Sequence, residues 1–117
     1  MKETRTQRTS IILVLALLFS VVATAQQAVR PAIQIRTPQE GAFVSGPTVL
    51  AVDVSAAAGT SIAEVKFFVD DVEVGSRTEP PWEITWDAGQ TFARRVIRVL
   101  GTDSTGGQSE ETVLTRD

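Results

Sequence analysis

The chain contains no cysteine, no histidine and no tyrosine among its 117 residues. Without cysteine it can form no disulfide, carry no lipid attached through a thioether and offer no thiolate to a metal. Without histidine it also lacks the commonest nitrogen ligand for a metal and the commonest general base. No His- or Cys-ligated metal is therefore expected, and acid–base chemistry would have to rest on carboxylates.

Long apolar runs are scarce as well. The one run, residues 11–22, is broken only by a serine and is shorter than the about 20 residues that a membrane-spanning helix needs. Three basic residues precede the run, and the small residues 23–25 follow it. This order predicts a signal peptide over residues 1–25, cleaved before Gln26, with a retained membrane anchor as the alternative.

The remainder of the chain is acidic. Removing Lys2, Arg5, Arg8 and Glu3 from the 11 basic and 14 acidic residues leaves 8 and 13, a net charge of −5. An acidic domain is poorly suited to nucleic acids and to anionic membranes. No nucleic-acid partner is expected, and a membrane is expected only through an uncleaved signal segment.

Apolar and polar residues alternate along most of the chain after a short leader at residues 26–31. Between residues 62 and 69, Val65, Phe67 and Val69 share one parity and face away from charged neighbours, which is typical of a half-buried strand. Turn residues separate such runs, as Asp70-Asp71 does here. The pattern predicts an all-β sandwich of about seven short strands over residues 32–117.

The inward-facing parity defines the expected core, and Trp86 is expected to be more buried than Trp82. The core set is Ile33, Ile35, Leu50, Val52, Val54, Val65, Phe67, Val69, Trp82, Ile84, Trp86, Ile97 and Val99.

Four motifs occur in a fixed order. They are Ile-x-Ile-x-x-Pro-x-x-Gly at residues 33–41, Val-x-Phe-x-Val-Asp at 65–70, Pro-aromatic-x-x-x-Trp-Asp at 81–87 and Thr-Asp-x-x-Gly at 102–106. With these motifs the chain resembles the bacterial Ig-like domains of exported and cell-surface proteins, a type also found beside von Willebrand factor A-like modules. Asp71 departs from the family, which usually has glycine there, so the type of turn stays open.

The resemblance implies an Ig-like, Greek-key β-sandwich from a bacterium. It also implies an exported location, whether periplasm, cell surface or the outside of the cell, and a spacer or binding role. It brings no catalytic residues.

Carboxylates are the remaining route to catalysis, and Glu79, Glu83 and Asp87 form the nearest cluster in the sequence. Glu83 and Asp87 would lie about 13 Å apart along a strand, which exceeds both working separations of glycoside hydrolases. A solvated sheet face explains them better, and no enzyme is expected.

Asp70, Asp71 and Glu73 could offer oxygens to a calcium ion, as could Asp103 with Ser104. A calcium ion takes about six to eight oxygens that converge on one point, whereas aspartates in turns need no metal to explain them. No metal and no cofactor are expected.

A candidate interaction surface comprises Phe68, Val96, Leu100 and Trp82. Phe68 lies on the outward parity of its strand, and Val96 and Leu100 lie on the outward parity of the strand expected from about residue 93 to residue 102. In an Ig-like sandwich these two strands are neighbours, so the three side chains would form one apolar patch. Trp82 begins another strand and is expected to be half buried. Cover by a loop, or docking against a neighbouring domain, is the alternative explanation of the patch.

The function expected from these features is a non-catalytic, exported interaction or spacer module that mediates protein–protein contact at the cell envelope. The alternative is an exported polysaccharide-binding module. Exposed aromatics aligned on one face would favour that alternative, and the sequence offers only Trp82 and Phe68.

Overall fold

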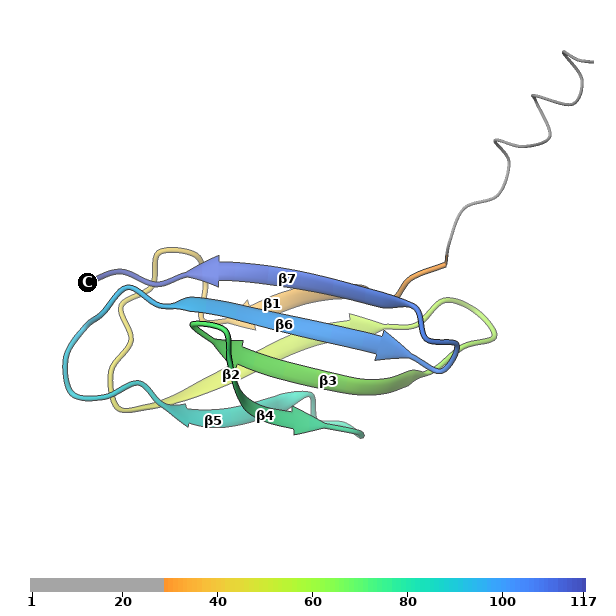
Figure 1. Cartoon of the computed structure of the whole chain (residues 1–117), viewed down its shortest axis with the longest axis horizontal. Coiled ribbons are helices and arrows are strands. Elements are labelled where there is room, and N and C mark those ends of the chain that lie inside the picture. Colours follow the sequence, from red (N-terminus) through yellow and green to blue (C-terminus); the bar gives the residue numbers. More distant parts are fainter. Residues whose placement is uncertain (1–28) are drawn as a thin grey trace, which may run out of the picture.

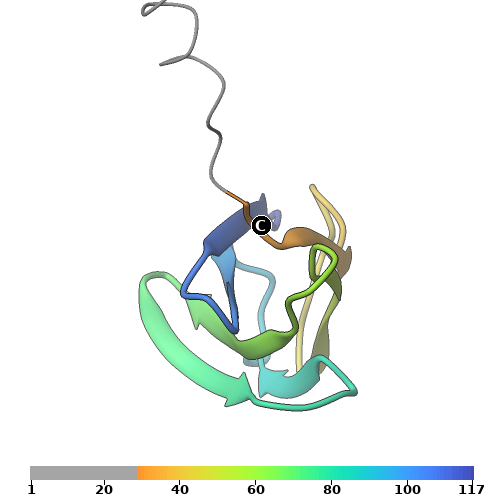
Figure 2. The same ribbon diagram turned by 90° about the vertical axis from the view of Figure 1, so that its right-hand side faces the viewer.

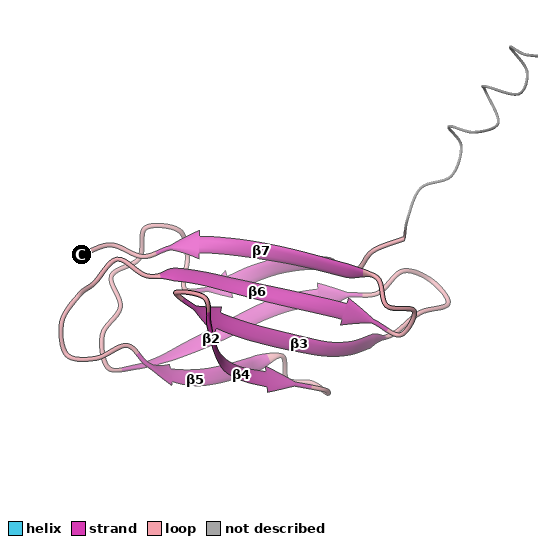
Figure 3. Cartoon of the chain, viewed as in Figure 1, coloured by secondary structure: helices cyan, strands magenta, loops and turns pink. Residues whose placement is uncertain are grey.

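The computed structural model describes residues 29–117, so the expected signal peptide and residues 26–28 lie outside the described part. This part consists of strands joined by turns and loops, with no helix between residues 29 and 117 (Figures 1 and 3). The strands are β1 (Ala32–Thr37), β2 (Pro47–Ser55), β3 (Ile62–Val69), β4 (Val72–Arg77), β5 (Glu83–Asp87), β6 (Val96–Asp103) and β7 (Gln108–Leu114).

The strands form two sheets that lie face to face (Figure 2). One sheet has the order β1-β2-β5 and the other the order β4-β3-β6-β7, and every pairing is antiparallel. The chain changes sheet after β2, after β4 and after β5, so these three connections cross between the two layers. This arrangement confirms the predicted all-β, Ig-like sandwich.

The core lies between the two sheets and contains the side chains expected from the alternation. The buried cluster consists of Ile35, Leu50, Val52, Val65, Phe67, Val69, Ile97, Val99 and Val113, and Ile33, Val54, Ile62, Val74, Trp82, Ile84 and Trp86 pack against it while partly exposed. All members of the predicted core set are in one of these two groups. Trp82 and Trp86 are both half-buried, whereas the largest fully buried side chain is Phe67.

Ala51 points outward from β2 yet is only 1% exposed. Arg36 of β1 forms ion pairs with Asp53 of β2, at 3.0 Å, and with Glu83 of β5, at 3.5 Å. Because β2 lies between β1 and β5, the second ion pair crosses over β2 at Ala51, which is opposite Glu83. Only a small side chain fits beneath the Arg36–Glu83 ion pair, and this ion pair in turn buries Ala51.

The strand expected from residue 93 begins at Val96. Residues 93–95 form a loop because the backbone there pairs with Thr115 rather than with a neighbouring strand. The hydroxyl of Thr115 accepts the N–H of Arg95 at 2.8 Å and donates to the carbonyl of Ala93 at 2.8 Å.

The β3–β4 hairpin turns at Asp70 and Asp71, with φ angles of 49° and 67°. Two central residues at positive φ are the mark of a type I′ turn, the turn that matches the twist of a two-residue hairpin. Asp71 is 91% exposed at its side chain and its one ionic contact, to Arg98, is long at 4.0 Å. Asp71 therefore adopts a left-handed backbone conformation, and its side chain makes little contact that could offset the energetic cost of that conformation.

Asp71→Gly is expected to raise the free energy of unfolding by about 0.5–1 kcal/mol, because glycine adopts positive φ without steric cost. Asp70→Gly is expected to lower it, because Asp70 accepts hydrogen bonds from the Val96 N–H at 2.9 Å and the Arg95 guanidinium at 3.1 Å. Thermal melts of the two variants test this contrast, and a lower melting temperature for Asp71→Gly would contradict it.

Candidate functional site

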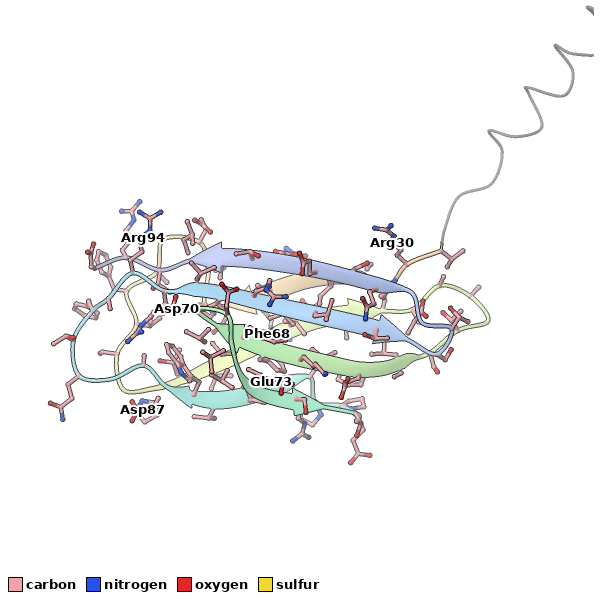
Figure 4. The ribbon with its side chains drawn as sticks, in the orientation of Figure 1. Arg30, Phe68, Asp70, Glu73, Asp87 and Arg94 are labelled. Atoms are coloured by element: carbon pink, nitrogen blue, oxygen red, sulfur yellow. The ribbon has the colours of Figure 1, made fainter. Side chains whose placement is uncertain are left out.

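The outer face of the four-stranded sheet carries three of the candidate interaction residues. Strand β3 pairs with β6, and Phe68 lies opposite Arg98. Val96 and Leu100 are the outward residues on either side of Arg98, so both are diagonal neighbours of Phe68. We call the surface formed by Lys66, Phe68, Val96, Arg98 and Leu100 the β3–β6 face; Figure 4 shows Phe68 near its middle.

Arg98 lies within the β3–β6 face rather than at its edge. Its guanidinium carbon is 4.2 Å from the centre of the Phe68 ring, and its nitrogen is 3.2 Å from a carboxylate oxygen of Glu110 on β7. Lys66 lies opposite Leu100 on the other side. Val96 pairs with Leu114 and is 38% exposed. The apolar side chains of this face are thus interleaved with guanidinium and ammonium groups.

Trp82 lies apart from the β3–β6 face. It precedes β5 in the three-stranded sheet, where its carbonyl accepts the N–H of Val52 at 3.1 Å and its indole packs against the core. The structure therefore brings Phe68, Val96 and Leu100 together, whereas Trp82 contributes to the interior.

Two of the three acidic residues that are neighbours in the sequence, Glu83 and Asp87, have structural partners. Glu83 is paired with Arg36 across β2. An oxygen of Asp87 accepts the N–H of Gly89 at 2.9 Å in the turn that follows β5. Glu79 is exposed between β4 and β5. These contacts hold strands and turns in place.

The carboxylate of Asp70 connects the β3–β4 hairpin to the start of β6. The Val96 N–H is the main group that holds the pKa of Asp70 below its usual value, and the Arg95 guanidinium adds to the effect. Arg95 itself lies with its guanidinium carbon 6.0 Å from the Trp86 ring.

Asp103 organises the turn between β6 and β7 and is only 2% exposed. One of its oxygens accepts the Thr105 hydroxyl at 2.8 Å, the Thr105 N–H at 2.9 Å and the Gly107 N–H at 2.8 Å. The Thr105 hydroxyl makes the largest contribution to lowering the pKa of Asp103, and these backbone N–H groups add to it. The aspartate of the Thr-Asp-x-x-Gly motif is therefore the acceptor around which the turn closes.

Between residues 29 and 117, no group of three or more histidines, cysteines and acidic residues converges as a metal site would. In the same part of the chain no helix is long and apolar enough to cross a membrane.

Sequence reasoning missed an exposed aromatic pair at one end of the sandwich. Phe43, between β1 and β2, and Phe92, between β5 and β6, are 56% and 55% exposed. Their ring centres are 5.4 Å apart at an interplanar angle of 64°. Neither residue belongs to an alternating run, so the only signal in the sequence was an aromatic residue in each of two loops.

A shallow hollow of about 290 Å³ lies at the same end, lined by Glu40, Gly41, Arg94, Leu114, Thr115, Arg116 and Asp117. Figure 4 shows Arg94 at the end of the molecule where the C-terminus lies. We call Phe43, Phe92 and the charged residues Glu40, Arg94 and Arg116 the phenylalanine pole.

One similar solved structure supports the fold. The fibronectin(III)-like modules of Clostridium thermocellum CbhA match with a TM-score of 0.67 at 22% identity, over 78% of this chain and 48% of that one. This chain thus spans about half the length of that matched structure. A superoxide reductase (neelaredoxin) variant from Ignicoccus hospitalis matches with a TM-score of 0.47 at 16% identity, over 81% of this chain and 84% of that one. A similarity as loose as the second says nothing about activity.

No curated protein matches the chain significantly. The bacterial Ig domain family matches residues 31–113, which include all the strands but the last residue of β7. Together with the two-sheet architecture and the four motifs, this match shows that the chain belongs to the family of bacterial Ig domains.

Proposed function

We propose that this domain is a non-catalytic, exported interaction module that contacts a protein partner at the cell envelope through the β3–β6 face. The observation that carries the proposal is the placement of Phe68, Val96 and Leu100 as neighbours on one outer sheet face. When one face of a sheet is open to water, the side chains on that face are normally polar. Apolar residues gathered there therefore favour contact with another surface.

Arg98 adds a second argument for contact with a protein. Aromatic residues and arginine are the side chains on which binding hot spots most often depend. Arg98 is held between the Phe68 ring and the Glu110 carboxylate, so part of its conformational freedom is already lost before a partner arrives. Side chains ordered in advance reduce the entropic cost of association.

The family supports the remaining parts of the proposal. Bacterial Ig-like domains are generally non-catalytic and commonly occur in exported proteins. For this chain, export is expected to release a mature protein that begins at Gln26. N-terminal sequencing of protein exported by a bacterial host tests the expectation, and recovery of protein that retains residues 11–22 would indicate a membrane anchor instead.

The contact is tested by the double variant Phe68→Ser with Leu100→Thr. We expect it to fold and to lose at least about 10-fold in partner retention from envelope extracts of the native bacterium, because both changes make the β3–β6 face polar. Val49→Ser is the matched control, since Val49 is 43% exposed on the outer face of the other sheet. Equal retention by the parent, the double variant and the control would contradict the proposal and leave the spacer role.

A polysaccharide-binding module is the second candidate, and the exposed Phe43 and Phe92 are the observation that favours it. Their rings are inclined by 64° and form no flat platform on which successive sugar rings would stack. Retardation of the parent domain, but not of Phe43→Ser with Phe92→Ser, in gels containing a soluble polysaccharide would support this candidate.

A further inference from the structure

The β6–β7 turn uses only one of the two carboxylate oxygens of Asp103. The Oδ1 atom accepts the Thr105 hydroxyl and the N–H groups of Thr105 and Gly107. The Oδ2 atom is buried and has no hydrogen-bond partner among residues 29–117, although Asp103 is only 2% exposed. Closure of the turn therefore explains the first oxygen. The second is an acceptor held away from water, which is costly unless another group satisfies it.

A second oxygen lies beside the Oδ2 atom of Asp103. This atom and the carbonyl oxygen of Val29 each lie 2.7 Å from the position that a Cβ atom on residue 107 would occupy. Gly107 does not adopt a positive φ, so glycine is required here by the closeness of the two oxygens rather than by the backbone conformation. The space in front of Gly107 is thus a cradle that is bordered by two acceptors and kept free of a side chain.

The Val29 carbonyl belongs to the segment that precedes β1. This segment is held against the start of β7 by the Ser109 hydroxyl, which donates to the Pro31 carbonyl at 2.6 Å. Figure 4 shows Arg30 of the same segment at one end of the sandwich and Arg94 at the other, so the cradle lies away from the phenylalanine pole. Val29 is 56% exposed, so solvent reaches the segment next to the cradle.

The chemistry of the two oxygens indicates what would fit between them. Two acceptors that border the same space are satisfied by a hydrogen-bond donor or by a cation, and no donor among residues 29–117 reaches the Oδ2 atom of Asp103. Carboxylate and main-chain carbonyl oxygens are the ligands that calcium takes. Magnesium demands a near-octahedral geometry and gives up its water reluctantly, so it fits such a pair of oxygens less well.

We propose that the Asp103 carboxylate and the Val29 carbonyl bind a calcium ion between the β6–β7 turn and the segment before β1. Water molecules on the exposed side of Val29 complete the coordination, since calcium takes about six to eight oxygens. With two protein ligands the affinity is low, with a dissociation constant of about 0.1–1 mM, as in extracellular calcium-binding modules. The site has a single acidic side chain, and the sequence alone predicted no metal. It is separate from the contact proposed for the β3–β6 face.

Titration of the isotope-labelled mature protein with calcium chloride, followed by nuclear magnetic resonance at constant ionic strength, tests the proposal. The amide resonances of residues 29–30 and 103–107 are expected to shift in a saturable manner, with a midpoint at about 0.1–1 mM calcium. Because the ion binds the folded state, about 10 mM calcium is expected to raise the melting temperature by at least about 4 °C. Magnesium at the same concentration is expected to raise it less.

Two substitutions remove the site in different ways. Asp103→Asn keeps an oxygen acceptor for the turn but removes the negative charge, so we expect it to fold and to bind calcium at least about 10-fold more weakly. Gly107→Ala places a methyl group 2.7 Å from both oxygens and is expected to abolish binding. Asp71→Asn is the matched control, because it removes a carboxylate that is 91% exposed in another turn, and it is expected to bind calcium as the parent does. If Gly107→Ala does not fold, Asp103→Asn still tests the site.

The absence of saturable shifts up to about 10 mM calcium would overturn the proposal, because water would then satisfy the two oxygens. Shifts spread over the acidic residues of the whole domain would also overturn it, since they would report screening of the negative charge. Calcium binding that is retained by Asp103→Asn would have the same consequence. None of these substitutions alters the β3–β6 face, so partner retention and calcium binding are lost or kept independently.

Discussion

Replacing Phe67 with alanine is expected to lower the free energy of unfolding by about 3–5 kcal/mol. Phe67 is 0% exposed at the centre of the buried cluster, between Val99 of β6 and Gly75 of β4. Removing the ring leaves a cavity between the two sheets. The sheets cannot move together to fill it, because the hydrogen bonds between strands hold each sheet in place. A domain of this size has a stability of only about 5–15 kcal/mol, so much of the variant is expected to be unfolded at 37 °C.

Phe68→Ala is the matched control, because it removes the same side chain from the next residue on the opposite face of β3. Phe68 is half-buried and contacts the Arg98 guanidinium, a contact that contributes about 0.5–1 kcal/mol at exposed sites. Urea unfolding of both variants measures the difference. Similar losses for Phe67→Ala and Phe68→Ala would contradict the observed division between inner and outer faces.

Asp103→Ala is expected to lower the melting temperature by roughly 10 °C. The substitution leaves the Thr105 N–H, the Thr105 hydroxyl and the Gly107 N–H without their acceptor in a turn where Asp103 is almost fully buried. Unpaired donors that have lost water are costly, and no neighbouring group replaces a carboxylate oxygen. A melting temperature within a few degrees of the parent value would show that water takes over these bonds.

The same carboxylate makes stability depend on pH. The pKa of Asp103 is lowered from its ordinary value of 3.8 on folding, so the folded state binds the proton less readily than the unfolded state. The resulting stabilisation is present above the ordinary pKa and is lost as pH falls through the lower, folded pKa. Asp70 adds a contribution of the same sign. Asp103→Asn keeps an oxygen acceptor, so we expect a smaller loss at neutral pH and a weaker decline of melting temperature below pH 4.

The core was predictable because strand periodicity is local information. Alternation at Val65, Phe67 and Val69 specifies one face of β3 whatever the rest of the chain does, and this face is buried. The hairpin at Asp70 and Asp71 was predictable for the same reason, since few residues tolerate positive φ. The residue that departs from the family at Asp71 left the turn type open, and the φ angles show that aspartate adopts the turn that glycine would.

The site could be predicted only in part, because side chains on a face depend on register and on loops. The pairing of β3 with β6 placed Val96 and Leu100 beside Phe68, as the fold class implies. That Arg98 rather than an apolar residue lies directly opposite Phe68 depends on a register that periodicity does not fix. Phe43 and Phe92 meet because two loops distant in the sequence lie at the same end of the sandwich, and no local pattern reports that.

For Trp82, two features of the sequence predict different degrees of burial. Its position next to two prolines at the start of a strand predicted half burial, which the structure shows, and its parity predicted a place in the core. The structure places the indole against the core because β5 begins directly after it and continues the inward parity of Ile84 and Trp86. For a residue at the end of a strand, the alternation of side chains and the distance from the sheet edge predict different exposed fractions of the side chain.

Photo-crosslinking in the native bacterium tests the contact through the β3–β6 face most directly. A benzoylphenylalanine is introduced in place of Val96, which is 38% exposed on this face, and separately in place of Val49, which is 43% exposed on the outer face of the other sheet. After irradiation of intact cells, position 96 is expected to yield a discrete adduct with one envelope protein, and position 49 is expected to yield none. No adduct from position 96, or the same adduct from both positions, would contradict a specific protein contact through the β3–β6 face.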